Sequence, residues 1–125
     1  PVCLAVTLLT SHTQADIEEL GLTGPVIDNA RRLARLAVEA GAGGVVCSGH
    51  ELSALRPALP EDTVYVVPGI RFADDDVGDQ VRVMTARRAV EAGATWIVVG
   101  RTIRDASDPV STAQRIVDDV AEAIE

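Results

Sequence analysis

Two arginines that follow apolar runs are the residues best suited to chemistry, and the chemistry they suit is phosphate binding. Arg71 lies shortly after the apolar run 64–67, and Arg101 follows the run 96–99 through Gly100. An arginine presents a planar fork of N–H donors to phosphate oxygens, and a neighbouring glycine lets the backbone N–H come close. The repeated pattern therefore predicts one anion site built from both arginines.

The charge composition limits the classes of ligand that the chain is expected to bind. The formal net charge is −8 and no basic stripe occurs along the chain, which argues against nucleic acid as a partner. A negative protein that binds an anion must concentrate its positive charge locally. Gln80, which lies between the two arginines, would add a neutral amide donor to the same site. All 11 basic residues are Arg, so the chain has no Lys for Schiff-base or proton-transfer chemistry.

The elements that must position these residues alternate between β-rich runs and helical patterns. We expect strands over 2–6, 44–47, 63–67 and 96–99, helices over 14–20, 25–40, 51–55, 85–92 and 109–124, and an acidic loop over 73–80. The last three strands are continuously apolar, so both of their faces should be buried, as in a parallel sheet covered by helices. Both arginines would then lie where the strands end, at the edge that binds ligands in α/β folds.

Two α/β architectures fit four such units. One is a small doubly wound sheet, and the other is half of an eight-stranded βα (TIM) barrel, whose full length is typically ~250 residues. Because barrels often bind phosphate after strands 7 and 8, the two arginine loops favour the second. We predict that residues 1–125 form one unit, the C-terminal half of a barrel with strands 5–8. Its outer strands would be unpaired, so we expect it to need a partner.

Five motifs then carry a resemblance to a known family. They are LAVTLLTS (4–11), GVVCS (44–48), PGIR (68–71), GDQVRVMT (78–85) and VVGRTI (98–103). With Glu51 and Asp108-Pro109, they resemble the C-terminal half of bacterial orotidine 5'-phosphate decarboxylases, over essentially all 125 residues. The resemblance implies a TIM barrel and a lyase that converts orotidine 5'-phosphate to UMP in pyrimidine biosynthesis, without metal or cofactor.

The resemblance also assigns substrate-binding roles. Thr10 would lie near the pyrimidine and Pro68 would form a wall beside the base. The phosphate would be held by Arg71, Gln80 and the Gly100-Arg101 pair. For Thr10 and Ser11 a second role, as a cap of the helix that follows, is equally expected, and the two roles are compatible.

The chain departs from the family at the catalytic residues. In the family, an Asp-x-Lys-x-x-Asp array and a further Lys and Asp precede the matched region, and this chain has no Lys. We therefore expect no catalytic residue here and no activity of the 125 residues alone. Either the chain is a fragment, as a start at Pro1 directly before a core strand suggests, or another polypeptide supplies strands 1–4. Removal of a Met before Pro1 would give the same start. The family resemblance also implies a homodimer.

Two alternative functions stay open. One is a non-catalytic half-barrel that binds a phosphorylated nucleotide, and the other is a related barrel enzyme that acts on a sugar phosphate. Thr10 and Pro68 favour a pyrimidine.

Cys3 and Cys47 lack CxxC spacing, and no signal peptide or membrane span is evident. We expect two reduced thiols packed in the core of a cytoplasmic protein with no membrane partner. The three adjacent Asp at 74–76 are expected to be a solvated face and not a metal site.

Overall fold

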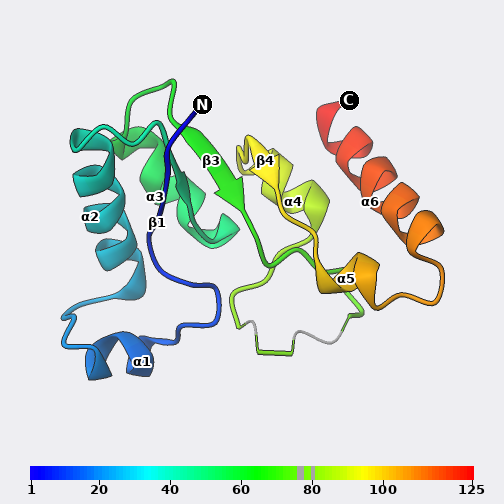
Figure 1. The fold of residues 1–125 in the computed structure, drawn as a ribbon, viewed down its shortest axis with the longest axis horizontal. Coiled ribbons are helices and arrows are strands. Elements are labelled where there is room, and N and C mark those ends of the chain that lie inside the picture. Colours follow the sequence, from blue (N-terminus) through cyan, green and yellow to red (C-terminus); the bar gives the residue numbers. More distant parts are fainter. Residues whose placement is uncertain (76–77, 80) are drawn as a thin grey trace.

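Four parallel strands alternate with helices and short 3-10 turns (Figure 1). The structure, a computed structural model, describes residues 1–75, 78–79 and 81–125. The strands are β1 (Leu4–Val6), β2 (Gly44–Val46), β3 (Val64–Val67) and β4 (Trp96–Ile97). The helices are α1 (Gln14–Glu19), α2 (Val26–Glu39), α3 (Leu52–Leu55), α4 (Ala86–Glu91), α5 (Arg101–Arg104) and α6 (Pro109–Ile124), with 3-10 turns η1 (Gly49–Glu51) and η2 (Arg56–Ala58).

The sheet has the strand order β1-β2-β3-β4, in which each strand pairs in parallel with its neighbour in the sequence. The register places Val6, Val46, Val66 and Trp96 side by side in one row. A doubly wound sheet reverses its strand order at a switch point, and this sheet does not. The order is that of half a βα barrel, the second of the two predicted architectures.

One face of the sheet is covered by helices. Alternate residues of a strand point to opposite faces, and Val45, Tyr65 and Val67 point to the helices. The main core also takes Leu52, Leu55, Ala86, Ala89 and Ile116 from the helical layer. A smaller cluster of Leu8, Ile17 and Ala30 lies beside it. Burial of this apolar face is what holds the sheet and helices together.

The other face is open at both edges of the sheet. Leu4 and Val6 of β1 are 41% and 59% exposed, and Trp96 of β4 is 67% exposed. Val98, just after β4, is 50% exposed. The prediction that the last strand is buried on both faces is therefore wrong for this chain. The physical reason is that β4 has a neighbour on one side only, and no described segment covers its second face.

Element boundaries follow the sequence closely where the apolar pattern is long. The helices predicted over 25–40 and 109–124 are observed as Val26–Glu39 and Pro109–Ile124. Strand β4 is shorter than the predicted 96–99, as expected for a strand with one partner. Helix α5 was not predicted, because four residues are too few to show a helical repeat of apolar residues.

Cys47 is buried as predicted. The prediction for Cys3 is wrong, because it precedes an edge strand and is exposed.

The loops that leave the strands gather at one edge of the sheet. In Figure 1, α1, α5 and the described parts of the loop between β3 and α4 lie at this edge, and both chain ends lie at the opposite edge. Helices α2 and α6 lie at the two flanks. Across the described residues, no helix is both long enough and apolar enough to cross a membrane. The predicted site residues that the structure describes lie along this one edge.

The open face gives a direct test of the half-barrel. The chain has one Trp, Trp96, so its fluorescence reports on the free edge of β4 alone. Adding the four βα units that the family resemblance predicts should bury Trp96 and shift its emission to shorter wavelength. The chain alone is the control. Complex formation with unchanged emission would contradict the placement of the missing strands beside β4.

Candidate functional site

Two hollows lie side by side at the loop edge of the sheet. The β1–β2 hollow, of about 260 Å³, is lined by Val6, Leu8, Leu9, Thr10, Ser11, Val46, Cys47, Pro68 and Asp79. The β3–β4 hollow, of about 240 Å³, is lined by Pro68, Gly69, Arg71, Val98, Gly100, Arg101 and Arg104. Pro68 lines both hollows, so they adjoin at this residue. Five of the six predicted site residues thus line one or both of them.

Thr10 is fixed in place by its backbone. Its carbonyl accepts the N–H groups of Val81 and Arg82, both at 3.2 Å, and the residue is only 7% exposed. Gly69 has a φ of +75°, and a Cβ there would lie 3.4 Å from Thr10 Cγ2. The positive φ of the turn after β3 therefore favours glycine, and the added Cβ would only just touch Thr10.

The helix-capping role predicted for Thr10 and Ser11 is wrong. Helix α1 begins at Gln14, and its N-cap is Thr13, whose hydroxyl accepts the N–H of Asp16 at 3.2 Å. The Asp16 carboxylate accepts the N–H of Thr13 in return at 2.7 Å, which completes a capping box. Thr10 and Ser11 instead line the β1–β2 hollow.

The β3–β4 hollow is cationic. Of its seven lining residues three are arginines, and no described Asp or Glu is among them. Arg71 is 7% exposed, and its Nη1 donates to the Ile70 carbonyl at 2.9 Å and to Thr102 Oγ1 at 3.0 Å. These bonds tie the loop after β3 to α5. Its other guanidinium nitrogens have no partner among the described residues.

Arg101 forms an ion pair with the carboxylate of Asp79. Its Nη2 lies 2.5 Å from Asp79 Oδ1, and its hydrogen bond holds the pKa of the Asp79 carboxyl below its usual range. Asp79 also lines the β1–β2 hollow, so its carboxylate lies between the two hollows. An anion that enters the β3–β4 hollow must therefore compete with Asp79 for this guanidinium.

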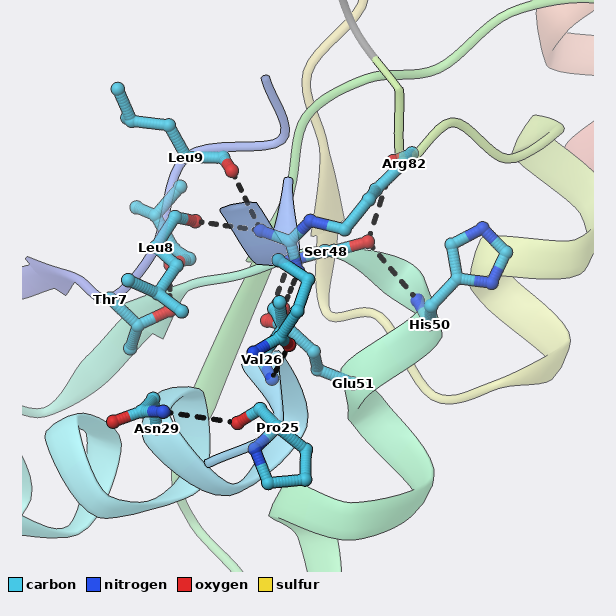
Figure 2. Close-up of polar contacts among 12 residues, drawn as sticks. Thr7, Leu8, Leu9, Pro25, Val26, Asn29, Ser48, His50, Glu51 and Arg82 are labelled. Carbon is cyan, nitrogen blue, oxygen red and sulfur yellow. Dashed lines mark hydrogen bonds and ion pairs between the residues drawn. The ribbon is translucent and has the colours of Figure 1, made fainter. Parts of the chain in front are cut away.

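A buried ion pair supports the segment that lines the β1–β2 hollow, and the sequence interpretation missed it. Figure 2 shows Arg82 in contact with Glu51, Leu8 and Leu9, which come from the segments after β1 and β2. Glu51 is 2% exposed, and its Oε2 accepts the Ser48 N–H at 3.1 Å. The spacing Ser48-x-x-Glu51 directly after a strand is a capping-box pattern, and it was the signal available for this residue.

Cys47 is part of the wall of the β1–β2 hollow and is not suited to act as a nucleophile. It lines the β1–β2 hollow and is 1% exposed. Burial raises the pKa of its thiol to about 12, although the charge of Arg82 opposes the shift. A thiol with such a pKa is protonated near neutral pH, and thiolate is the reactive form of cysteine.

The sequence-predicted site residues thus divide between the hollows. Thr10 and Pro68 line the first, and Pro68, Arg71, Gly100 and Arg101 line the second. Gln80 lies outside the described residues. In the part of the chain that the structure describes, no three His, Cys, Asp or Glu side chains are grouped so as to hold a metal ion.

Comparison with known proteins identifies the family. Residues 1–116 match the family described as Orotidine 5'-phosphate decarboxylase / HUMPS. The chain belongs to this family. It is 47% identical over 123 residues to orotidine 5'-phosphate decarboxylase of Gluconobacter oxydans, covering 98% of this chain and 52% of that protein. It is 54% identical over 113 residues to the enzyme of Anaeromyxobacter sp. strain K, covering 90% of this chain and 50% of that protein.

A solved structure supports the fold. Orotidine 5'-phosphate decarboxylase of Lactobacillus acidophilus superposes with a TM-score of 0.77 at 36% identity, over 96% of this chain and 49% of that one. The chain therefore spans about half the length of the relatives it matches. This family membership and the sequential strand order confirm the predicted half of a TIM barrel.

The contact between Asp79 and Arg101 yields a prediction about anion binding. Replacing Asp79→Asn removes the carboxylate that occupies Arg101, so affinity for inorganic phosphate should rise by about threefold, the scale of an exposed ion pair. The titration can be followed by the NMR signal of Arg101 Nε–H. Asp74→Asn, which removes the same charge from the same loop, is the control and should change affinity less. Equal effects of both variants would show that only net charge matters.

Proposed function

We propose that this chain is the substrate-binding half of an orotidine 5'-phosphate decarboxylase, which converts orotidine 5'-phosphate to UMP. The observation that carries the proposal is the junction of a cationic hollow and a largely apolar hollow at Pro68. A pyrimidine nucleotide has a charged phosphate and a flat ring at its two ends, and the two hollows suit these two ends. The names of the relatives support the same substrate.

In this proposal the phosphate binds in the β3–β4 hollow. Arg101 would exchange the Asp79 carboxylate for phosphate oxygens, and Arg71 would add the guanidinium nitrogens that have no partner among the described residues. Gly100 would bring its backbone close to the phosphate, and Gln80 would donate its side-chain amide. Charge-assisted bonds from arginine are among the stronger hydrogen bonds in proteins, which suits a small ligand that must be held at one end.

The pyrimidine would bind in the β1–β2 hollow. Val6, Leu8 and Val46 offer apolar surface there, and Pro68 offers a rigid wall for one side of the ring. Thr10 and Ser11 bring hydroxyl groups that can bond to the polar edge of the base. Such a mixture, apolar walls with a few placed polar groups, is typical of small-molecule sites.

The chemical step would come from the other half of the barrel. When the bond to the carboxylate breaks, CO2 leaves, the electron pair stays on the ring carbon, and that carbon must take up a proton. The chain has no Lys to supply it, and the family resemblance places the Lys and Asp residues in the preceding half. We propose that the preceding half closes the barrel against β1 and β4. The assembled enzyme would be a homodimer and would work in the cytoplasm.

Complementation tests the proposed activity. The chain is mixed with the N-terminal half of the Gluconobacter oxydans relative, and consumption of orotidine 5'-phosphate is followed by absorbance. We expect decarboxylation by the mixture and none by either half alone. If the mixture binds UMP but performs no chemistry, a non-catalytic nucleotide-binding module is favoured. If it binds ribose 5-phosphate as tightly as UMP, a sugar-phosphate enzyme is favoured.

Arg101→Ala tests the phosphate assignment in the same mixture. Loss of a charged hydrogen bond should weaken UMP binding by about 1.5–3 kcal/mol, roughly ten- to a hundredfold in affinity. Arg31→Ala is the matched control, because Arg31 also pairs with an Asp, at 3.0 Å, but lies on α2 away from the hollows. Unchanged affinity for UMP in a calorimetric titration of Arg101→Ala would refute the assignment.

A further inference from the structure

Arg82 joins the segment after β1 to the segment after β2. Its Nη1 forms an ion pair with Glu51, and its Nη2 donates to the Leu9 carbonyl at 2.7 Å and, more weakly, to that of Leu8 at 3.4 Å (Figure 2). Its backbone N–H donates to the Thr10 carbonyl at 3.2 Å. One residue thus binds three successive carbonyls of the segment after β1.

The other end of this connection is rigid. Glu51 uses one carboxylate oxygen to accept the Ser48 N–H and the other to accept Arg82, and it is almost fully buried. Ser48 Oγ in turn donates to the Arg82 carbonyl at 3.4 Å. The segment after β2 therefore holds Arg82 by side chain and backbone together. Arg82 Nε is buried without a partner among the described atoms, so the two terminal nitrogens carry the side-chain attachment.

The segment that Arg82 holds has other attachments as well: Leu8 is buried in the smaller core cluster, and the Leu9 and Thr10 carbonyls accept the N–H groups of His12 and Val81. Strand β1 is an edge strand with three residues, and Thr7 extends its pairing by donating its N–H and Oγ1 to the Val46 carbonyl, both at 3.2 Å. Beyond Thr7, Leu8 and Leu9 line the β1–β2 hollow, and Thr10 follows them into it. The arginines of the β3–β4 hollow bond instead to Ile70, Thr102, Asp79 and Asp105, and none of the described contacts joins them to residues 7–10.

We propose that Arg82 is a positioning residue that holds the segment carrying Thr10 at a fixed distance from the β3–β4 hollow. This inference rests on the proposed function and deepens it. Arg82 touches no substrate, and its effect passes through the Leu8, Leu9 and Thr10 carbonyls. A ligand that needs both hollows, such as UMP, depends on Arg82, whereas a ligand that needs the β3–β4 hollow alone does not.

Arg82→Lys is the sharpest variant. It keeps the charge, but a single ammonium group cannot reach Glu51 and the Leu9 carbonyl with two separate nitrogens as a guanidinium does. In the chain assembled with the N-terminal half of the Gluconobacter oxydans relative, affinity for UMP should fall by about tenfold, the scale of one lost charged hydrogen bond. Affinity for ribose 5-phosphate should stay unchanged. Hydrogen exchange of the amides in 7–13 should accelerate, while exchange in α6 should not.

Arg87→Lys is the matched control. Arg87 also bonds two partners, Glu91 at 3.0 Å and Glu122 at 2.8 Å, but on helices away from the hollows. It should change neither affinity nor the exchange of 7–13. If Arg82→Lys fails to fold, Glu51→Gln serves in its place, because its amide oxygen can still accept the Ser48 N–H while the ion pair is lost.

Each outcome decides the inference. Equal losses of UMP and ribose 5-phosphate affinity in a folded variant would show that Arg82 only stabilises the fold, and unchanged exchange in 7–13 would show that it holds nothing there. Either result overturns the proposal. If the unmodified assembly binds neither ligand, the proposed function fails instead, and the exchange of 7–13 still decides whether Arg82 fixes this segment.

Discussion

Each strand of this sheet pairs in parallel with the next strand in the sequence, and the other features of the molecule follow from that order. Connections between parallel neighbours are right-handed in nearly all proteins. When the strands also advance in one direction, every helix must return on the same side. This explains why the helices cover one face, why the second face is open, and why all strand-end loops meet at one edge. The two hollows exist because Pro68, Thr10 and Arg101 are brought to that edge.

Local sequence patterns predicted the strands and the loops that follow them, but they could not predict which residues meet across the sheet or which faces are covered. Gly100 and Arg101 were predictable because a long apolar run ends there, and the same run predicted β4. The run could not reveal that one face of β4 has no cover, since an apolar side chain looks the same whether or not a partner is present. The ion pair of Arg82 with Glu51 joins residues 31 apart in the sequence, and no periodicity records such a contact. The capping error at Thr10 arose because Thr13, three residues on, has the better partner in Asp16.

Most of the arginines around the hollows are paired with carboxylates. Arg82, Arg101 and Arg104 are each paired with a carboxylate, from Glu51, Asp79 and Asp105. Arg71 is different, because none of the described ion pairs includes it and its bonds go to a carbonyl and a hydroxyl. Asp79 and Asp105 act on this buried charge electrostatically, without forming a described ion pair with it. The bound phosphate of the proposed function would be the anion in direct contact with it.

The row of side chains on the open face is uneven in size. Across the sheet, Val6, Val46 and Val66 are followed by Trp96, so three medium side chains end in the largest one at the free edge. Protein interiors are packed as densely as organic crystals, and an indole needs space that a valine does not. Whatever strand comes to lie beside β4 must therefore leave room for this indole. The shape of one side of the barrel thus restricts which sequences can form the other.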